Sequence, residues 1–187
     1  SSDLTRLERE LAKHGLDRYQ IDLGFLERLP HVVREGDWKI TLTILKEGCG
    51  PRLTTVEAGD TRGRLYGLAF DIGTTGVRGE LLDLNEGKVL SRGVEYNGQR
   101  IYGDDVISRI AYCTKPDGMA KLQQAVVATL NGLIAEMTNR ANVPAGDVSY
   151  ITIAGNTTMI QLLLAIDPKY LRLAPYVPAA SLLPPMP

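Results

Sequence analysis

Cysteine is scarce in this sequence. Only two cysteines, Cys49 and Cys113, occur among 187 residues, and they lie far apart without a Cys-x-x-Cys spacing. An iron–sulfur cluster needs more thiolate ligands than this, so the chain cannot hold one by itself. The two histidines, His14 and His31, are equally isolated, which disfavours a zinc site. Low cysteine usage is typical of a reducing compartment, and we expect a cytoplasmic protein.

Long apolar runs and an excess of charge of one sign are also missing. No apolar run is long enough to cross a bilayer, and no signal peptide opens the sequence. Lys and Arg number 21 against 22 for Asp and Glu, and the two signs are interspersed. This pattern disfavours both a nucleic-acid partner and an anionic membrane surface. With 44% hydrophobic and 23% charged residues, the chain has the ordinary composition of one or two globular domains.

The first part of the chain predicts a small α+β domain over residues 1–62. The periodicity of apolar residues predicts helices over residues 2–14 and 22–35, a strand over 37–46, a turn over 48–51 and a return strand over 52–58. We expect the second helix to be interrupted at Pro30, because proline removes a helical hydrogen bond. A polar connector over residues 59–63 marks the domain boundary, so the two parts should pack with separate cores and separate sheets.

The second part, residues 63–187, has a different pattern. The expected elements are strands over Leu65–Asp71, Val77–Leu84, Lys88–Tyr96 and Ser149–Ala154, and helices over Asp105–Cys113, 116–139 and 158–166. Asp104 is expected to cap the first of these helices. The long helix should bury one stripe of side chains, formed by Leu122, Val126, Leu130, Leu133 and Met137. The order β-β-β-α-β-α predicts an α/β, RNase H-like half-domain, followed by a proline-rich, extended stretch over residues 167–187.

One stretch of this second part carries most of the chemistry. A buried strand leads into Asp71 and then into the turn Gly73-Thr74-Thr75-Gly76. A carboxylate at a strand tip is a ligand for a hard cation such as Mg2+. The glycines permit a sharp turn and close approach of a ligand, and the threonine amides and hydroxyls can donate to phosphate oxygens. A plain hairpin turn without function is the alternative interpretation.

A second polar tip follows the fourth expected strand, where the sequence reads Gly155-Asn156-Thr157. Ligands of α/β folds gather at such strand ends, so Asn156 and Thr157 could face a terminal phosphate or its attacking water. Capping of the following helix is the alternative, because Asn and Thr are good capping residues. Further back, Asp105 and Arg109 stand at i, i+4, and we expect an ion pair on the surface of a helix.

Four segments carry a resemblance to a known family. They read DIGTT at 71–75, YGDDVISRI at 102–110, AGNTTMIQLLLAIDP at 154–168 and LAPYVP at 173–178. The first resembles the leading phosphate motif of the actin, sugar-kinase and heat-shock-chaperone superfamily, also called the ASKHA superfamily. In this order the four together resemble the ATP-dependent reductive activators of corrinoid proteins. The family more often has a third threonine where this chain has Gly76.

The resemblance implies a fold, a function and a set of site residues. Residues 1–62 would be a small middle domain, and residues 63–187 the first half of an actin-like ATPase domain. The whole protein would return a corrinoid (cobalamin) protein from Co(II) to Co(I), with ATP, Mg2+ and electrons from a two-iron ferredoxin domain that this chain lacks. Asp71 would hold the metal and act in catalysis with Asn156. The residues of the turn and of the second polar tip would bind phosphate, namely Gly73, Thr74, Thr75, Gly76, Gly155 and Thr157.

The resemblance also implies that this chain forms only one of the two sides of a nucleotide-binding site. No second glycine-rich phosphate loop follows residue 76, so the chain is expected to be an inactive fragment. The missing half would come from the rest of the same polypeptide or from a second copy. Two other functions remain open, namely a small-molecule kinase of the same superfamily and a non-catalytic module that docks on the corrinoid protein. A kinase would need a general-base Asp and a substrate-binding insertion, neither of which is evident in the sequence.

Overall fold

The computed structural model describes residues 2–47 and 50–180. The described residues divide into two compact units, with the division between Leu65 and Tyr66. We call residues up to Leu65 the N-terminal unit and residues from Tyr66 onward the C-terminal unit, and each is described by itself. No helix in the described ranges is both long and apolar enough to cross a membrane.

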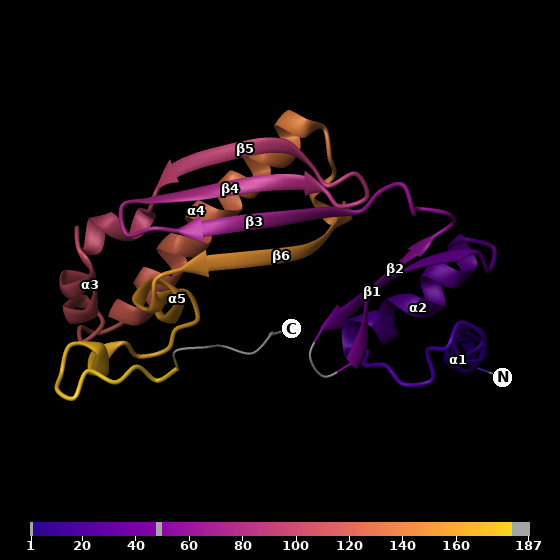
Figure 1. Ribbon diagram of the computed structural model, residues 1–187, viewed down its shortest axis with the longest axis horizontal. Coiled ribbons are helices and arrows are strands. Elements are labelled where there is room, and N and C mark those ends of the chain that lie inside the picture. The colour runs from indigo at the N-terminus through magenta and orange to yellow at the C-terminus, as the bar shows by residue number, and fades with distance from the viewer. Residues whose placement is uncertain (1, 48–49, 181–187) are drawn as a thin grey trace. The chain divides into compact units, whose positions relative to one another are not determined.

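The N-terminal unit packs two helices against a β-hairpin (Figure 1). Its elements are α1 (Asp3–Lys13), α2 (Leu23–Glu35), β1 (Ile40–Glu47) and the antiparallel β2 (Gly50–Ala58). Both helices begin at a side-chain cap, because Ser2 accepts from the amide of Thr5 and Asp22 accepts from the amide of Phe25. One apolar cluster forms the core, and its buried members are Leu7, Leu11, Phe25, Leu29, Val33, Leu53 and Val56. The predicted turn at 48–51 lies partly outside the described residues.

Helix α2 corrects one prediction, because it continues through Pro30 without interruption. Pro30 lies on the exposed face of the helix. Phe25, Leu29 and Val33 are buried on the opposite face and hold the helix against the hairpin on both sides of the proline. Packing of an apolar face therefore outweighs the loss of one helical hydrogen bond at the surface.

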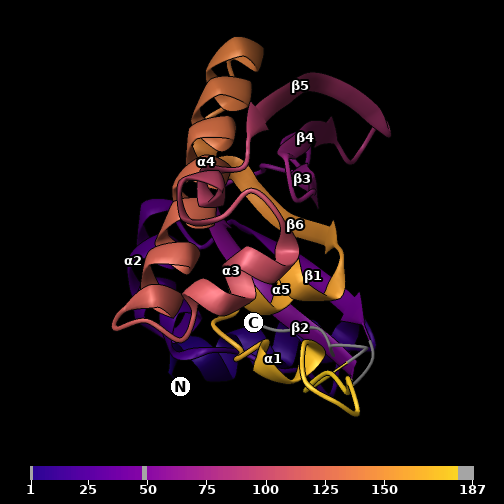
Figure 2. The same ribbon diagram turned by 90° about the vertical axis from the view of Figure 1, so that its left-hand side faces the viewer.

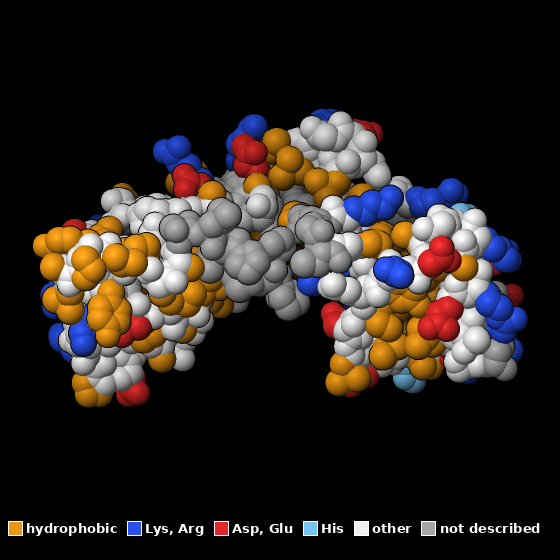
Figure 3. All heavy atoms as spheres, turned by 60° about the horizontal axis from the view of Figure 1, so that its bottom comes forward, with side chains coloured by type: hydrophobic (Ala, Val, Ile, Leu, Met, Phe, Trp, Pro, Cys, Tyr) orange, Lys and Arg blue, Asp and Glu red, His pale blue; other side chains and the backbone are white. Residues whose placement is uncertain are grey.

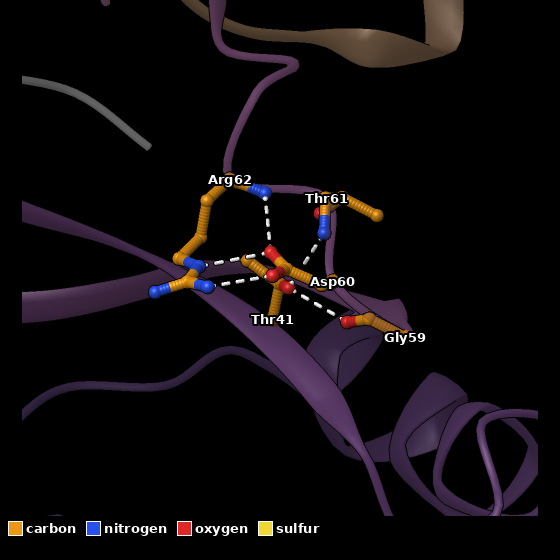
Figure 4. A network of polar contacts seen from close by, with 5 residues as sticks. All are labelled: Thr41, Gly59, Asp60, Thr61 and Arg62. Carbon is orange, nitrogen blue, oxygen red and sulfur yellow. Dashed lines mark hydrogen bonds and ion pairs between the residues drawn. The ribbon is translucent and has the colours of Figure 1, made fainter.

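The polar connector after β2 is a hydrogen-bonded turn rather than a loose linker (Figure 4). Thr41 on β1 donates through its hydroxyl to the carbonyl of Gly59 at 2.7 Å and accepts from the amide of Thr61 at 2.9 Å. Arg62 forms two side-chain bonds to the Asp60 carboxylate, of 2.9 and 2.6 Å. These bonds, with one from the Arg62 amide, lower the pKa of Asp60 to about 2. On the face of this unit that Figure 3 shows, side chains of both charge signs are interspersed.

The C-terminal unit is built on a four-stranded mixed sheet. Its strands are β3 (Tyr66–Ile72), β4 (Gly76–Asp83), β5 (Lys88–Tyr96) and β6 (Val148–Gly155). The order across the sheet is β5-β4-β3-β6, in which the first three form an antiparallel meander and β6 runs parallel to β3 (Figure 1). The prediction that the N-terminal strands form a sheet of their own is confirmed, since β1 pairs only with β2 among the described strands.

The described part of the C-terminal unit has three α-helices, and the longest of them, α4, covers one face of the sheet. They are α3 (Val106–Tyr112), α4 (Gly118–Ala141) and α5 (Thr157–Leu163), with short 3-10 helices at η1 (Gly98–Tyr102), η2 (Ala145–Asp147) and η3 (Lys169–Leu171). Figure 2 shows α4 lying along one side of the sheet. The predicted stripe of α4 is confirmed, because all five of its residues are buried, and they pack in one cluster with Leu68, Phe70, Ile72, Val77 and Leu81 of the strands. The mixed α/β architecture predicted for this unit is thereby confirmed.

Candidate functional site

The two predicted polar tips lie together at one edge of the sheet. Strands β3 and β6 are parallel neighbours, with Asp71 opposite Ala154 and Ile72 opposite Gly155. Both strands therefore end at the same edge, one in the turn 73–76 and the other in Asn156. The amide Nδ2 of Asn156 lies 3.4 Å from the hydroxyl oxygen of Thr74, which joins the tips directly. The structure thus brings together residues that are 82 positions apart.

The turn 73–76 is tight and depends on glycine. The Gly73 amide donates to the Gly76 carbonyl at 2.9 Å, so the chain reverses within four residues. A Cβ atom at position 73 would stand 2.7 Å from that carbonyl oxygen, closer than any side chain is found. Gly76 then opens β4, where it pairs with Tyr96. Any larger residue at position 73 would force the turn open.

Three successive carbonyls of the turn accept hydrogen bonds from behind it. The Gly73 carbonyl accepts from Asn97 Nδ2 at 2.9 Å, and the Thr75 carbonyl accepts from the Asn97 amide at 2.9 Å. Between them the Thr74 carbonyl accepts from Arg109 Nη2 at 2.6 Å. The amides of Thr74 and Thr75 have no acceptor within the described part of the chain. Successive free amides in a turn form a concavity suited to an anion.

Arg109 overturns the prediction of a surface ion pair with Asp105. Its side chain is fully buried, and its Nε donates to the Gly103 carbonyl at 2.9 Å. Asp105 instead caps α3 by accepting from the Ser108 amide at 2.8 Å, a bond that lowers the pKa of the Asp105 carboxyl. The expected cap Asp104 was therefore one residue early. Burial lowers the pKa of Arg109, while the charges of Asp104 and Asp105 act in the opposite direction.

Asp71 lies beside the turn, and its side chain is on the face of the sheet opposite the apolar core. Its neighbours Phe70 and Ile72 point into the core, and the strand alternation places the Asp71 side chain on the opposite, exposed face. Its carboxylate has no hydrogen-bond donor among the residues described. A free carboxylate at this position can bind a cation or a water molecule. No group of three or more His, Cys, Asp or Glu side chains is gathered for a metal in the described ranges.

Asn156 caps a helix and also contacts the turn. Its Oδ1 accepts from the Met159 amide at 3.0 Å, which begins α5, while its Nδ2 faces Thr74. Capping, one of the two predicted roles, is therefore observed. Gly155 and Thr157, on either side of it, are exposed at the same edge.

The sequence reasoning missed the role of three buried polar residues behind the turn, since Asn97 and Gln99 were not singled out and Arg109 was expected at the surface. All three are fully buried, and Gln99 connects Arg109 to the long helix, since its Oε1 accepts from Arg109 Nη1 at 3.3 Å and its Nε2 donates to the Leu122 carbonyl at 3.0 Å. One signal was present in the sequence. Arg109 stands three residues after Val106 and directly before Ile110, on the buried side of the helix.

The fold defines a mixed α/β protein with polar residues gathered at one edge of its sheet, and comparisons with known proteins give the family. Residues 66–187 match the RACo middle region, and residues 1–63 match the RACo linker region. The chain therefore belongs to the RACo family, the reductive activators of corrinoid proteins. The boundary between the two matched regions coincides with the division between the two units.

Two relatives support this assignment. The corrinoid activation enzyme RamQ of Eubacterium limosum is 40% identical over 114 residues, which are 60% of this chain and 19% of that protein. A solved structure of a reductive activator for corrinoid, iron-sulfur protein matches with a TM-score of 0.86 at 39% identity, covering 100% of this chain and 30% of that one. The chain thus spans less than a third of the length of either relative.

Proposed function

We propose that this chain supplies one side of an ATP site in an activator that returns a corrinoid protein from Co(II) to Co(I). The observation that carries the proposal is the turn 73–76, whose carbonyls are fixed behind it and whose two threonine amides are free. Such a turn suits the phosphate chain of a nucleotide. The family membership and the names of both relatives support the corrinoid context.

The residues around the turn fit phosphate and magnesium. Thr74 and Thr75 would donate amides and hydroxyls to phosphate oxygens, with Gly73 and Gly76 keeping the backbone close to them. Gly155, Asn156 and Thr157 would face the terminal phosphate from the second tip. Asp71 would hold Mg2+ directly or through water, because a free carboxylate is a preferred partner of this cation, and the remaining ligands would be phosphate and water oxygens. The ion would neutralise the charge of the phosphates.

The topology supports an RNase H-like interpretation of the C-terminal unit as the first half of an actin-like domain. An antiparallel meander followed by a helix and a parallel strand is the observed order. In such a domain the second half would hold the other side of the phosphates and the adenosine. The rest of the same polypeptide, or a second copy, would supply it.

The electrons would enter through a ferredoxin domain outside this chain. Cys113 does not offer a ligand here, because burial raises the pKa of its thiol to about 11 and keeps it protonated at neutral pH. The chain would therefore contribute nucleotide chemistry and binding to the corrinoid protein, and the redox centre would lie elsewhere in the protein.

The test uses the full-length activator with its corrinoid protein and a reductant. We expect ATP-dependent formation of Co(I), followed by its absorption spectrum, together with phosphate release. Asp71→Asn should abolish both, since it removes the negative charge without changing the size of the side chain. Arg92→Gln, a change at an exposed residue of β5 paired with Glu80, is the control. ATP-independent formation of Co(I), or binding to the corrinoid protein without hydrolysis, would contradict the proposal and favour the docking module.

A further inference from the structure

Arg109 is a buried cation without a matching anion. Its side chain has no exposed surface, and no carboxylate of the described residues forms an ion pair with it. Its partners are neutral, namely the carbonyls of Gly103 and Thr74, the amide oxygen of Gln99 and the sulfur of Met159. Burying a charge in this way is costly. A fold that retains such a group at a candidate site points to a use for its charge or its geometry.

The contact of Arg109 with the turn sets the direction of an amide. A trans peptide is planar, so its carbonyl and its N–H point in opposite directions. Arg109 Nη2 holds the Thr74 carbonyl inward at 2.6 Å, which turns the Thr75 amide outward. Asn97 Nδ2 acts in the same way on the preceding peptide, since it holds the Gly73 carbonyl and turns the Thr74 amide outward. Each of the two free amides thus has its own buried anchor.

The surroundings keep the guanidinium in place. Gly103, whose carbonyl accepts from Arg109 Nε, has no room for a side chain, because a Cβ there would meet Ser108 Oγ at 2.5 Å and the Arg109 amide at 2.9 Å. Gln99 is fixed in turn by its bond to the Leu122 carbonyl of α4. The guanidinium is therefore connected both to the long helix of the core and to the turn. A fork of several donors can hold these acceptors together, and a lysine could not.

We propose that Arg109 is a positioning residue for the phosphate-binding turn. It fixes the peptide between Thr74 and Thr75 so that the Thr75 amide faces an anion, and it leaves its positive charge directly behind that amide. The inference rests on the proposed function and deepens it, because it assigns to this arginine the recognition of phosphate as distinct from the rest of the nucleotide. Arg109 itself does not touch the ligand.

The test compares Arg109→Gln and Arg109→Lys with the control Arg92→Gln in the full-length activator. Dissociation constants for ATP and for adenosine are measured by calorimetry, together with thermal melts. Hydrogen bonds to a charged group are worth about tenfold to a hundredfold in an equilibrium, and we expect a loss of this size in ATP affinity for Arg109→Gln. Adenosine lacks phosphate, so its affinity should stay within about twofold of the wild-type value. Arg109→Lys keeps the charge without the forked guanidinium, so its ATP affinity should lie between that of the wild type and that of Arg109→Gln.

The other possible results of this experiment would contradict the positioning role of Arg109. Equal losses for ATP and adenosine would reveal a general loss of structure and overturn the inference, as would an unchanged ATP affinity in both variants. If Arg109→Gln does not melt cooperatively, Arg109→Lys decides, and failure of both to melt cooperatively would make Arg109 a residue of core stability alone. If the wild-type protein binds no ATP, the proposed function fails and takes the inference with it. If it binds ATP and the variants bind as tightly, only the inference fails.

Discussion

The two units differ in what they bury. Buried side chains of the N-terminal unit are almost all apolar, and Thr61 is the one buried polar residue among those described there. The C-terminal unit buries a series of polar side chains, namely Ser91, Asn97, Gln99, Arg109, Thr138, Thr158 and Gln161. Four of these seven, counted as Asn97, Gln99, Arg109 and Thr158, lie behind the turn or at the start of α5.

This difference separates a unit with an almost wholly apolar core from the unit that carries the candidate site. Buried polar groups cost free energy unless they are hydrogen-bonded, and networks of them are expensive to maintain. The N-terminal unit keeps its polar bonds near the surface, in helix caps and in the turn around Thr41 and Asp60. In the C-terminal unit, Asn97 and Arg109 direct buried donors at the carbonyls of one turn. The cost falls where the candidate ligand would bind.

The largest effect should come from testing residues 1–187 for ATP hydrolysis without the proposed second half of the nucleotide site. Residues 1–187 alone should not hydrolyse ATP, because phosphoryl transfer needs both sides of the phosphate chain held and groups that act as a unit are not additive. Adding the missing half of the protein should restore hydrolysis, and Asp71→Ala should abolish it again. Phosphate release from the chain, from the reconstituted pair and from the Asp71→Ala pair measures this. Turnover by the chain alone that disappears with Asp71→Ala would refute the half-site interpretation.

The next effect separates the stability of the two cores. Leu53→Ala in the N-terminal unit and Leu122→Ala in the C-terminal unit each remove a side chain that is 1% and 0% exposed, respectively. Each should destabilise its own unit by about 2–5 kcal/mol. Amide hydrogen exchange, measured in each unit at increasing urea concentration, gives the free energy of unfolding of each unit separately.

The control for these variants is Leu23→Ala, at a leucine that is 69% exposed. It should change the free energy of unfolding by less than about 0.5 kcal/mol. Leu53→Ala should also leave the ATP affinity of the full-length protein unchanged. Destabilisation of the C-terminal unit by Leu53→Ala would show that the two units do not fold independently.

A smaller effect concerns Asn156, which caps α5 and also lies at the candidate site. Asn156→Ala removes the cap of α5 and should cost about 1 kcal/mol of stability. It should lower ATP turnover of the full-length protein by more than this loss explains, because the side chain also faces Thr74. Thermal melts and hydrolysis rates on the same variant measure both. Asn156→Ser is the matched variant, because it retains a capping oxygen and loses the amide that faces Thr74. Normal turnover in both variants would leave capping as the sole role of Asn156.

The smallest effect should come from the exposed turn of the N-terminal unit. The pKa of Asp60 is lowered to about 2, chiefly by its hydrogen bonds from Arg62. A carboxyl with a depressed pKa stabilises the fold above its unfolded pKa of about 4, and this stabilisation is lost as the pH falls toward 2. Asp60→Asn should therefore lower the melting temperature slightly at pH 7 and by a smaller amount at pH 2, where about half of the Asp60 carboxyls are protonated in the folded state. An equal difference at both pH values would show that the charge of Asp60 has no part in it.

The sequence predicts the regular elements of this chain well and the connections between them poorly. Strand β5 begins and ends at the predicted residues, and the five-residue stripe of α4 is buried as expected, because both follow from a local period of apolar residues. Asp71, the turn 73–76 and Asn156 were placed as candidates by strand ends and glycines, which are also local signals. Their meeting at one edge follows from the parallel pairing of β3 with β6.

The errors arise where distant contacts outweigh local preference. Asp105 and Arg109 have the spacing of a surface ion pair, but Arg109 instead bonds to Thr74, 35 positions away. Pro30 should interrupt a helix, but the packing of Leu29 and Val33 holds it continuous. In both cases the deciding contact is with a distant segment, the turn 73–76 for Arg109 and the β-hairpin for the buried face of α2. The network of Asn97, Gln99 and Arg109 could not be predicted for the same reason, since its backbone acceptors lie in the turn 73–76, at Gly103 and in α4.

The pairing of β3 with β6 also has a consequence for how the chain folds. Strands β3 and β4 are joined by a turn of a few residues, so this hairpin can close quickly. Strand β6 reaches β3 only after β5, α3 and α4 have been traversed, and closing a long loop costs more entropy than closing a short one. We therefore expect the turn 73–76 to form early and Asn156 to arrive late. During synthesis, the turn 73–76 would leave the ribosome well before Asn156, and the candidate site would stay incomplete until β6 pairs with β3.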